Sequence, residues 1–172
     1  MINVDIAIND SIWKKEHRLI AGKIKSLIKQ IIPETELKEY LDHNIEISIL
    51  LTNDQEITEL NQNYRNKNNP TNVLSFPAID FKKIKKNKNY LTNIQKQLGA
   101  ILLGDIILAY QTIHQESILQ NKKFFHHLSH LIVHSLLHLI GYDHVKEKDA
   151  VIMENLEIDL LKKLDIANPY LI

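Results

Sequence analysis

Cysteine does not occur among the 172 residues of this chain. Its absence excludes disulfide frameworks, thiol catalysis, iron–sulfur clusters and cysteine-based zinc fingers. Glycine and proline are scarce, with four residues of each, which leaves little room for flexible linkers. At this length we expect one domain, residues 1–172, with a hydrophobic core and long regular elements.

Neither sign of charge is in excess, because 21 basic residues balance 21 acidic ones. This balance excludes a globally basic nucleic-acid-binding protein, so any contact with a polyanion has to come from a local patch. Long hydrophobic runs are also missing. The two most apolar stretches, 100–110 and 131–140, are too short to cross a bilayer, and the first residues do not resemble a secretory signal. We therefore expect a cytoplasmic protein without a membrane segment.

Hydrophobic periodicity predicts strands that interleave with helices. The expected strands are 2–8, 45–51, 73–76 and 99–108. The expected helices are 11–32, one that begins near residue 54 and ends near 65, 110–120, 121–140 and 147–164. Helix 121–140 is apolar around most of its circumference and should be central and buried. This pattern indicates an α/β or α+β class with a small mixed sheet.

Residues 80–97 form a polar segment rich in lysine, which we expect to be an insertion in the domain. Its lysines are Lys82, Lys83, Lys85, Lys86, Lys88 and Lys96. Such a run is typical of a solvated surface, and this is the interpretation we favour. An arm that faces RNA is the alternative.

Histidine is the residue type that points to chemistry. His134 and His138 are four residues apart, so a helix places both imidazoles on one face within reach of one metal ion. Gly141 can then adopt the left-handed conformation that ends a helix and bring His144 back. Three neutral nitrogen donors suit Zn²⁺ and leave a fourth position open, as in catalytic zinc sites.

The other histidines of the same helix have simpler interpretations. His126 and His127 are typical of hydrogen-bonded core or rim residues. His130 precedes His134 by one turn and could be mistaken for a ligand. The spacing of the three predicted ligands and the glycine matches the metzincin signature H-E-x-x-H-x-x-G-x-x-H.

The metzincin general base is replaced in this chain. Ser135 stands where those peptidases have glutamate, and a hydroxyl of high pKa cannot act as a base near neutral pH. A metal-bound water with a pKa near ~7 can still supply hydroxide for a phosphodiester. Such cleavage also needs a fixed cation, and the guanidinium of Arg65 matches a phosphate with two hydrogen bonds. Taken alone, Arg65 is typical of an exposed helix end.

Four blocks of the sequence resemble the YbeY-type metal-dependent endoribonucleases of bacteria. They are Leu60-Asn61 with Tyr64-Arg65, residues 70–77 (PTNVLSFP), residues 103–106 (LGDI) and residues 134–144 (HSLLHLIGYDH). The blocks follow the family's order and span most of the chain. The resemblance implies an α+β fold, in which a small mixed four-stranded sheet is packed by helices and the metal-binding helix is central.

The resemblance also implies a site and an activity. It assigns one Zn²⁺ per chain to His134, His138 and His144, and it places Arg65 in the cleft as a catalytic residue. The implied reaction is endonucleolytic cleavage of single-stranded RNA, and no DNA substrate is expected. The implied setting is maturation of the 16S rRNA 3′ end and ribosome quality control, with the ribosome or ribosomal proteins as partners.

The chain departs from the family pattern at Asn72, where aspartate is usual, at Ser135, where glycine is usual, and in the length of segment 80–97. Asp105 and Asp143 are candidates for orienting a ligand imidazole, although a turn residue and a helix-end residue are equally typical roles for them.

Two other functions fit the residues. One is a zinc peptidase or amidase that takes its base from elsewhere, and the other is a non-catalytic ribosome-associated module stabilised by zinc.

Overall fold

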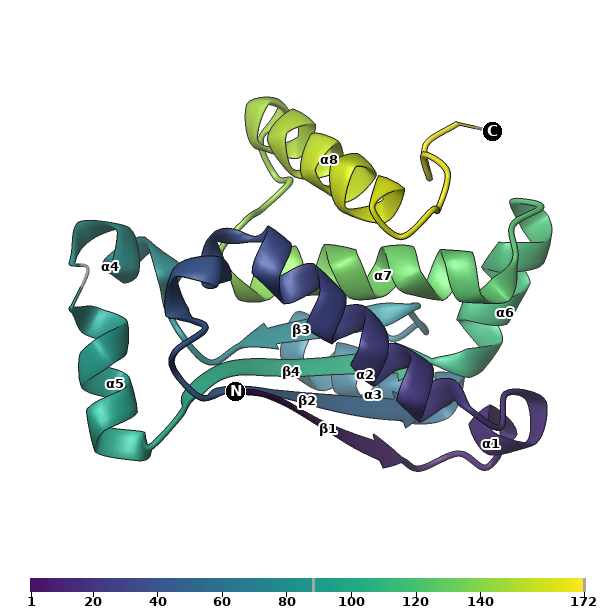
Figure 1. Cartoon of the computed structure of the whole chain (residues 1–172). Coiled ribbons are helices and arrows are strands. Elements are labelled where there is room, and N and C mark those ends of the chain that lie inside the picture. The colour runs from purple at the N-terminus through teal and green to yellow at the C-terminus, as the bar shows by residue number, and fades with distance from the viewer. Residues whose placement is uncertain (88, 172) are drawn as a thin grey trace.

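Four strands form one mixed sheet in the order β1-β2-β4-β3 (Figure 1). The strands are β1 (Ile2–Ile8), β2 (Ile45–Thr52), β3 (Val73–Pro77) and β4 (Ile101–Ala109). The first, second and fourth run parallel, and β3 pairs with β4 in the antiparallel direction at one edge. The structure is a computed structural model that describes residues 1–87 and 89–171. This sheet confirms the expected α+β class.

Helices cover both faces of the sheet (Figure 1). The α-helices are α1 (Ile12–Glu16), α2 (Ile20–Ile31), α3 (Asp54–Arg65), α4 (Phe81–Lys86), α5 (Tyr90–Leu98), α6 (Tyr110–Leu119), α7 (Phe124–Leu139) and α8 (Glu147–Lys162). Two 3₁₀ turns, η1 (Ile32–Glu34) and η2 (Glu36–Tyr40), follow α2. The helices α2 and α7 lie on one face, and α8 crosses over α7 (Figure 1).

The alternation of side chains along β4 explains why the helices form two layers. Ile106 and Leu108 point into the main core, which also contains the buried residues of α2 and α7. Ile107 points to the other face, where it packs with Ile57 of α3 and Leu74 of β3 in a separate cluster. Successive residues of a strand face opposite sides of the sheet. Because helices cover most of both faces, β4 is largely apolar on both sides, with Asp105 as an exposed exception.

The single helix expected over residues 11–32 is wrong, because the chain forms α1 and α2 with a break between them. His17 has φ −139° and ψ 72°, which lies outside the helical region, and its ring stacks on Phe124 at 4.3 Å. Trp13 is fully buried and its indole N–H donates to the Thr52 carbonyl at 2.8 Å. These tertiary contacts redirect the chain at the sheet edge, and they outweigh local helix propensity.

Segment 80–97, which we expect to be a solvated insertion, is partly buried, and its status as an insertion stays a prediction. It forms α4 and most of α5, and Phe81, Ile84 and Leu91 are buried, with at most 6% of each side chain exposed. Lys88 of the lysine run lies outside the described residues. The many lysines make this segment look polar. However, the apolar residues Phe81 and Ile84 are three positions apart, so they lie together on the core-facing side of α4.

The remaining expected elements are present, with ends that differ by a few residues. For example, Asn53 caps α3, because its side chain accepts a hydrogen bond from the Glu56 N–H at 2.9 Å. Within the described residues, no helix combines the length and the apolar composition that crossing a membrane would require.

Candidate metal centre

The structure brings together the three histidines that we predicted as metal ligands. His134 and His138 come from α7, and His144 comes from the loop that follows it. One ring nitrogen of each lies within 4.8 Å of the others. The His134 side chain is 24% exposed and His144 is exposed, so the cluster can be reached from outside. Such access is a feature of catalytic rather than structural zinc sites.

A tight turn at Gly141 carries the chain from α7 to His144. Gly141 has a φ of +91°, and its N–H donates to the His138 carbonyl at 3.0 Å. The Tyr142 N–H donates to the Leu137 carbonyl at 3.0 Å and so satisfies one of the last carbonyl groups of the helix. The turn therefore directs His144 back over the end of its own helix.

The hydrogen-bond partners of the two helical histidines define which ring nitrogen is free. The Nδ1 of His134 lies 2.7 Å from Glu157 Oε1, and the Nδ1 of His138 lies 3.0 Å from the Tyr142 carbonyl oxygen. Both partners are acceptors, so each Nδ1 carries the hydrogen and donates it. Each Nε2 is therefore left with a lone pair.

The two Nε2 atoms face each other at 3.1 Å, although neither has a hydrogen to share. Two lone pairs at that distance repel unless a cation lies between them. Tetrahedral zinc, with Zn–N bonds of about 2.0–2.1 Å, separates its nitrogen ligands by roughly 3.4 Å. The donor set therefore fits a divalent transition-metal ion. Three imidazoles accept zinc, nickel, cobalt or copper, so the arrangement alone does not select the metal.

Burial keeps His138 in the form that binds metal. Desolvation, followed by the neighbouring His134 and His144, lowers the pKa of His138, whereas the Tyr142 carbonyl and Asp143 oppose the shift, and the net result is a pKa of about 4. The imidazole is therefore neutral at pH 7 and its lone pair does not have to be freed from a proton before it binds metal.

Glu157 of α8 is the residue that sequence reasoning missed. It is 1% exposed and accepts hydrogen bonds from His134, from His130 Nε2 at 2.6 Å and from the Tyr170 hydroxyl. Burial alone would raise the pKa of Glu157, but these hydrogen bonds outweigh it and lower the pKa to about 2. The carboxylate is therefore ionised. A signal was present, because Glu157 occupies a position where the helical period of Met153 and Leu161 calls for an apolar side chain.

The two aspartates considered for this orienting role have other positions. Asp143 accepts a hydrogen bond from the backbone N–H of His144 at 2.7 Å, so it holds the loop rather than a ring. Asp105 is exposed on β4 opposite Phe76 and lines a surface cavity on the face that α3 covers. His130 donates to Glu157 and is not part of the triad.

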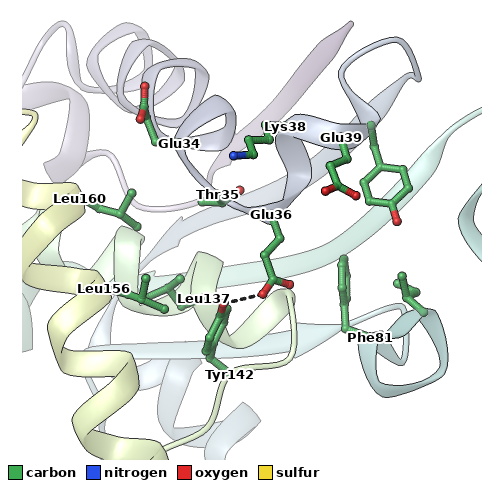
Figure 2. Close-up of a pocket in the computed structure, with 12 residues that line it drawn as sticks. Glu34, Thr35, Glu36, Lys38, Glu39, Phe81, Leu137, Tyr142, Leu156 and Leu160 are labelled. Carbon is green, nitrogen blue, oxygen red and sulfur yellow. Dashed lines mark hydrogen bonds between the residues drawn. The ribbon is translucent and has the colours of Figure 1, made fainter. Parts of the chain in front are cut away.

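Tyr142 anchors the loop that bears His144 to another part of the chain. The Tyr142 hydroxyl donates to Glu36 Oε1 at 2.8 Å across a cavity of about 530 Å³ (Figure 2). Burial, followed by this hydrogen bond, raises the pKa of Tyr142 to about 12, so the phenol remains a donor at physiological pH. Phe81 and Leu137 form apolar walls of the same cavity (Figure 2).

Arg65 does not contact the histidines. It is the last residue of α3, on the opposite face of the sheet from α7, and it is exposed. Its guanidinium makes no hydrogen bond or ion pair with any other residue in the ranges 1–87 and 89–171. Asn66 follows it in the left-handed conformation, with a φ of +55°, and turns the chain towards β3.

The structure shows what surrounds Ser135 and Asn72, the two residues that depart from the family pattern. Ser135 is fully buried, and its hydroxyl has no hydrogen-bond partner among the described residues, so it is on the core side of α7, where it cannot act as a base. Asn72 donates to both oxygens of Glu116, at 3.1 and 2.9 Å. An aspartate at position 72 would place a second carboxylate against Glu116.

Comparison with known proteins places the chain in a family. A family model described as endoribonuclease YbeY matches residues 10–165. The chain belongs to this family. Membership confirms the expectation of an enzyme that hydrolyses RNA, and the histidine cluster lies within the matched residues.

Curated YbeY proteins match nearly the whole chain. The endoribonuclease YbeY of Bartonella bacilliformis is 39% identical, over 99% of this chain and 98% of its own length. The endoribonuclease YbeY of Sinorhizobium fredii is 36% identical, over 98% of this chain and 92% of its own length. The solution structure of TM1509 from Thermotoga maritima shares the fold, with a TM-score of 0.60 at 21% identity, over 95% of this chain and 89% of that one.

Proposed function

We propose that this YbeY family member is a metal-dependent endoribonuclease that cleaves single-stranded RNA and holds one Zn²⁺ on His134, His138 and His144. The observation that carries the proposal is the pair of hydrogen-free Nε2 atoms that face each other at 3.1 Å in an accessible cluster. A cation resolves their repulsion, and an open coordination position is what a hydrolytic metal site requires.

The chain's own residues prepare the site for this chemistry. When bound, the metal ion would lower the pKa of a water molecule and polarise a phosphoryl oxygen. Glu157 holds the Nδ1–H of His134, and the Tyr142 carbonyl holds that of His138, so both rings present Nε2. The burial of His138 keeps its ring neutral.

Arg65 is proposed to bind a phosphate of the RNA and to stabilise its charge. Its support is the absence of an acidic partner within the described residues and the two-pronged geometry of a guanidinium. Because α3 and α7 lie on opposite faces of the sheet, an RNA strand that contacts both sites would have to pass around the β3 edge.

The biological setting is proposed from family membership. It comprises maturation of the 16S rRNA 3′ end and ribosome quality control, in the cytoplasm, with the ribosome or ribosomal proteins as partners and no DNA substrate. Single-stranded RNA suits a chain of balanced charge, since a duplex-binding surface would require a large basic face.

The two alternative functions are less well supported by the site. A peptidase or amidase would have to take its base from outside α7, because Ser135 is buried on the core side of that helix, and the matched family is one of endoribonucleases. A purely structural metal is normally enclosed by four protein ligands, whereas this cluster has three histidines, one of them exposed.

The deciding experiment is cleavage of a labelled single-stranded RNA by zinc-loaded protein freed of contaminating ribonucleases, with bound metal measured by elemental analysis. His138→Ala should lose both metal and cleavage. His126→Ala removes a histidine of the same helix that is outside the cluster, and it should retain both. Equal cleavage by the wild type and His138→Ala would exclude the metal-dependent mechanism. Bound metal without cleavage of RNA would lead next to a panel of peptides.

A further inference from the structure

We propose that Tyr170, in the turn that follows α8, is a positioning residue for the metal centre. It acts through Glu157, the carboxylate that orients His134. The inference rests on the proposed metal site and extends it to a segment that contributes no ligand. It makes metal affinity depend on the fold of residues 166–171.

The first observation is that the two oxygens of the Glu157 carboxylate have different hydrogen-bond partners. Its Oε1 accepts the Nδ1–H of His134 at 2.7 Å. Its Oε2 accepts from His130 Nε2 at 2.6 Å and from the Tyr170 hydroxyl. Oε1 therefore binds the predicted metal ligand, and Oε2 accepts hydrogen bonds from two other side chains. Two donors on Oε2 restrict rotation of the carboxylate and so keep Oε1 aimed at His134.

The second observation is that Tyr170 is itself held in place. Its N–H donates to Asn168 Oδ1 at 2.9 Å, which closes a turn. Lys122, from the connection between α6 and α7, donates to the Pro169 carbonyl at 2.5 Å. The Tyr170 ring packs edge-on against His130, with 5.5 Å between ring centroids. The turn is therefore tied to α6–α7 on one side and to α8 on the other (Figure 1).

The third observation is the position of the ring beside the cluster. A cavity of about 190 Å³ adjoins His134 and His144, and Tyr170, Glu154 and Glu157 form part of its lining. The aromatic ring walls the cavity, whereas only the hydroxyl holds the carboxylate. Tyr170→Phe therefore removes the hydrogen bond and keeps the wall.

These contacts predict graded effects on metal affinity. Groups that hydrogen-bond to a metal ligand typically contribute 10- to 100-fold to affinity, so Glu157→Gln should weaken zinc binding by about that factor. Tyr170→Phe leaves Oε2 with one donor and should weaken binding by about three- to tenfold. The neutral phenol adds no charge, so this loss reports on the orientation of the carboxylate.

Two matched controls separate positioning from general packing. Glu116→Gln changes a carboxylate of α6 that lies 2.7 Å from His127 Nε2. His127 is on α7, as are His134 and His138, but it is outside the triad. Tyr40→Phe makes the tyrosine substitution in η2, where the side chain packs near His43. Both controls should bind zinc within about twofold of the wild type, whatever they do to stability.

The experiment uses the full chain stripped of metal. Zinc dissociation constants are measured at 25 °C by competition with a chelating dye, and the visible spectrum of the Co²⁺-loaded protein reports the coordination geometry. Apo-protein melting temperatures are recorded in parallel. We expect weaker zinc binding and altered Co²⁺ bands in Tyr170→Phe and Glu157→Gln, and neither change in the controls.

Each other result has a defined meaning. If the wild type binds neither metal, the proposed site and this inference are both overturned. If the wild type binds zinc and Tyr170→Phe matches Tyr40→Phe in affinity and spectrum, Tyr170 only packs, and the metal site stands without it. If Glu157→Gln does not fold, Tyr170→Phe alone decides, because it retains the buried carboxylate.

Discussion

Histidines on one helix acquire different roles from the partners of individual ring nitrogens. On α7, His127 and His130 use Nε2 to bind carboxylates. His134 and His138 use Nδ1 instead, which leaves Nε2 free for a metal. A difference of one ring atom therefore separates a structural histidine from a candidate metal ligand.

Replacing Arg65 with alanine tests its proposed role in holding RNA. Its guanidinium has no partner in the described residues, so Arg65→Ala should leave the free energy of unfolding within about 0.5 kcal/mol of the wild type. Metal content should not change, whereas RNA cleavage should fall by about 100-fold or more. Arg18→Ala is the matched control, since Arg18 is the other arginine and is also exposed. Full-rate cleavage by Arg65→Ala would make Arg65 an ordinary surface residue.

Glu116 gives a test of pH dependence that does not involve the cluster. Burial raises the pKa of Glu116, but hydrogen bonds from His127 and Asn72 outweigh it, so the folded-state pKa lies below the ordinary value. A carboxyl group with a lowered pKa stabilises the fold above its unfolded-state pKa, and this contribution is lost as pH falls through the folded-state pKa.

The wild type should therefore exceed Glu116→Gln in free energy of unfolding by about 1 kcal/mol at pH 7, a low figure because the carboxylate is 30% exposed. The difference should shrink below pH 4.5, the ordinary value for glutamate. Urea denaturation of both proteins across this range measures it. A difference that grew as the pH fell below 4.5 would contradict the assignment.

At the scale of elements, the end of α7 is where the fold and the site depend on each other. Gly141 has a φ of +91°, and a Cβ built there would lie 2.8 Å from the Cβ of Phe81. Phe81 belongs to α4, in the segment whose lysine content concealed its buried face. Segment 80–97 therefore packs directly against the turn that positions His144.

Gly141→Ala should damage stability and metal binding together. The positive φ and the overlap with Phe81 should cost about 1–3 kcal/mol, and displacement of His144 should weaken zinc binding. Gly22→Ala is the control, because Gly22 lies within α2 with nothing within 4 Å of the added Cβ. The control should be neutral or more stable by up to about 1 kcal/mol. Unchanged zinc affinity in a less stable Gly141→Ala would show that the turn does not set the position of His144.

At the scale of the whole molecule, a metal on the triad would link distant segments. The ligands come from α7 and the following loop, and Glu157 and Tyr170 connect them to α8 and the turn after it. Tyr142 connects the loop to η2 through Glu36. A ligand that binds the folded state and not the unfolded chain stabilises all of these connections at once.

Removing the metal should therefore lower the melting temperature of the whole chain. Free zinc at 100 times its dissociation constant should add about 2.7 kcal/mol, which corresponds to about 5–10 °C for a domain of this size. Calorimetry with and without a chelator measures the shift, and His138→Ala should show none. An equal shift in His138→Ala would place the bound zinc at another site.

Local rules account for what could be predicted from the sequence. The spacing of His134, His138, Gly141 and His144 determined that three imidazoles converge, because helix geometry and the conformations open to glycine depend only on nearby residues. Alternation of apolar residues likewise predicted β1 and β2, while a preceding turn signal predicted β3 and a continuous apolar run predicted β4. The same rules failed at His17 and Phe81, where contacts with distant segments decided the outcome.

Only the tertiary structure decided how the cluster is oriented. Glu157 lies 23 residues from His134, and it reaches that ring because α8 crosses α7. The same crossing brings Tyr170 to the carboxylate. Arg65 lies on the other face of the sheet because it ends α3, which packs there. Helix geometry and the turn at Gly141 make the histidine nitrogens meet. The packing of α8 on α7 leaves Nε2 of His134 available to a metal, because a buried carboxylate orients the imidazole that donates to it.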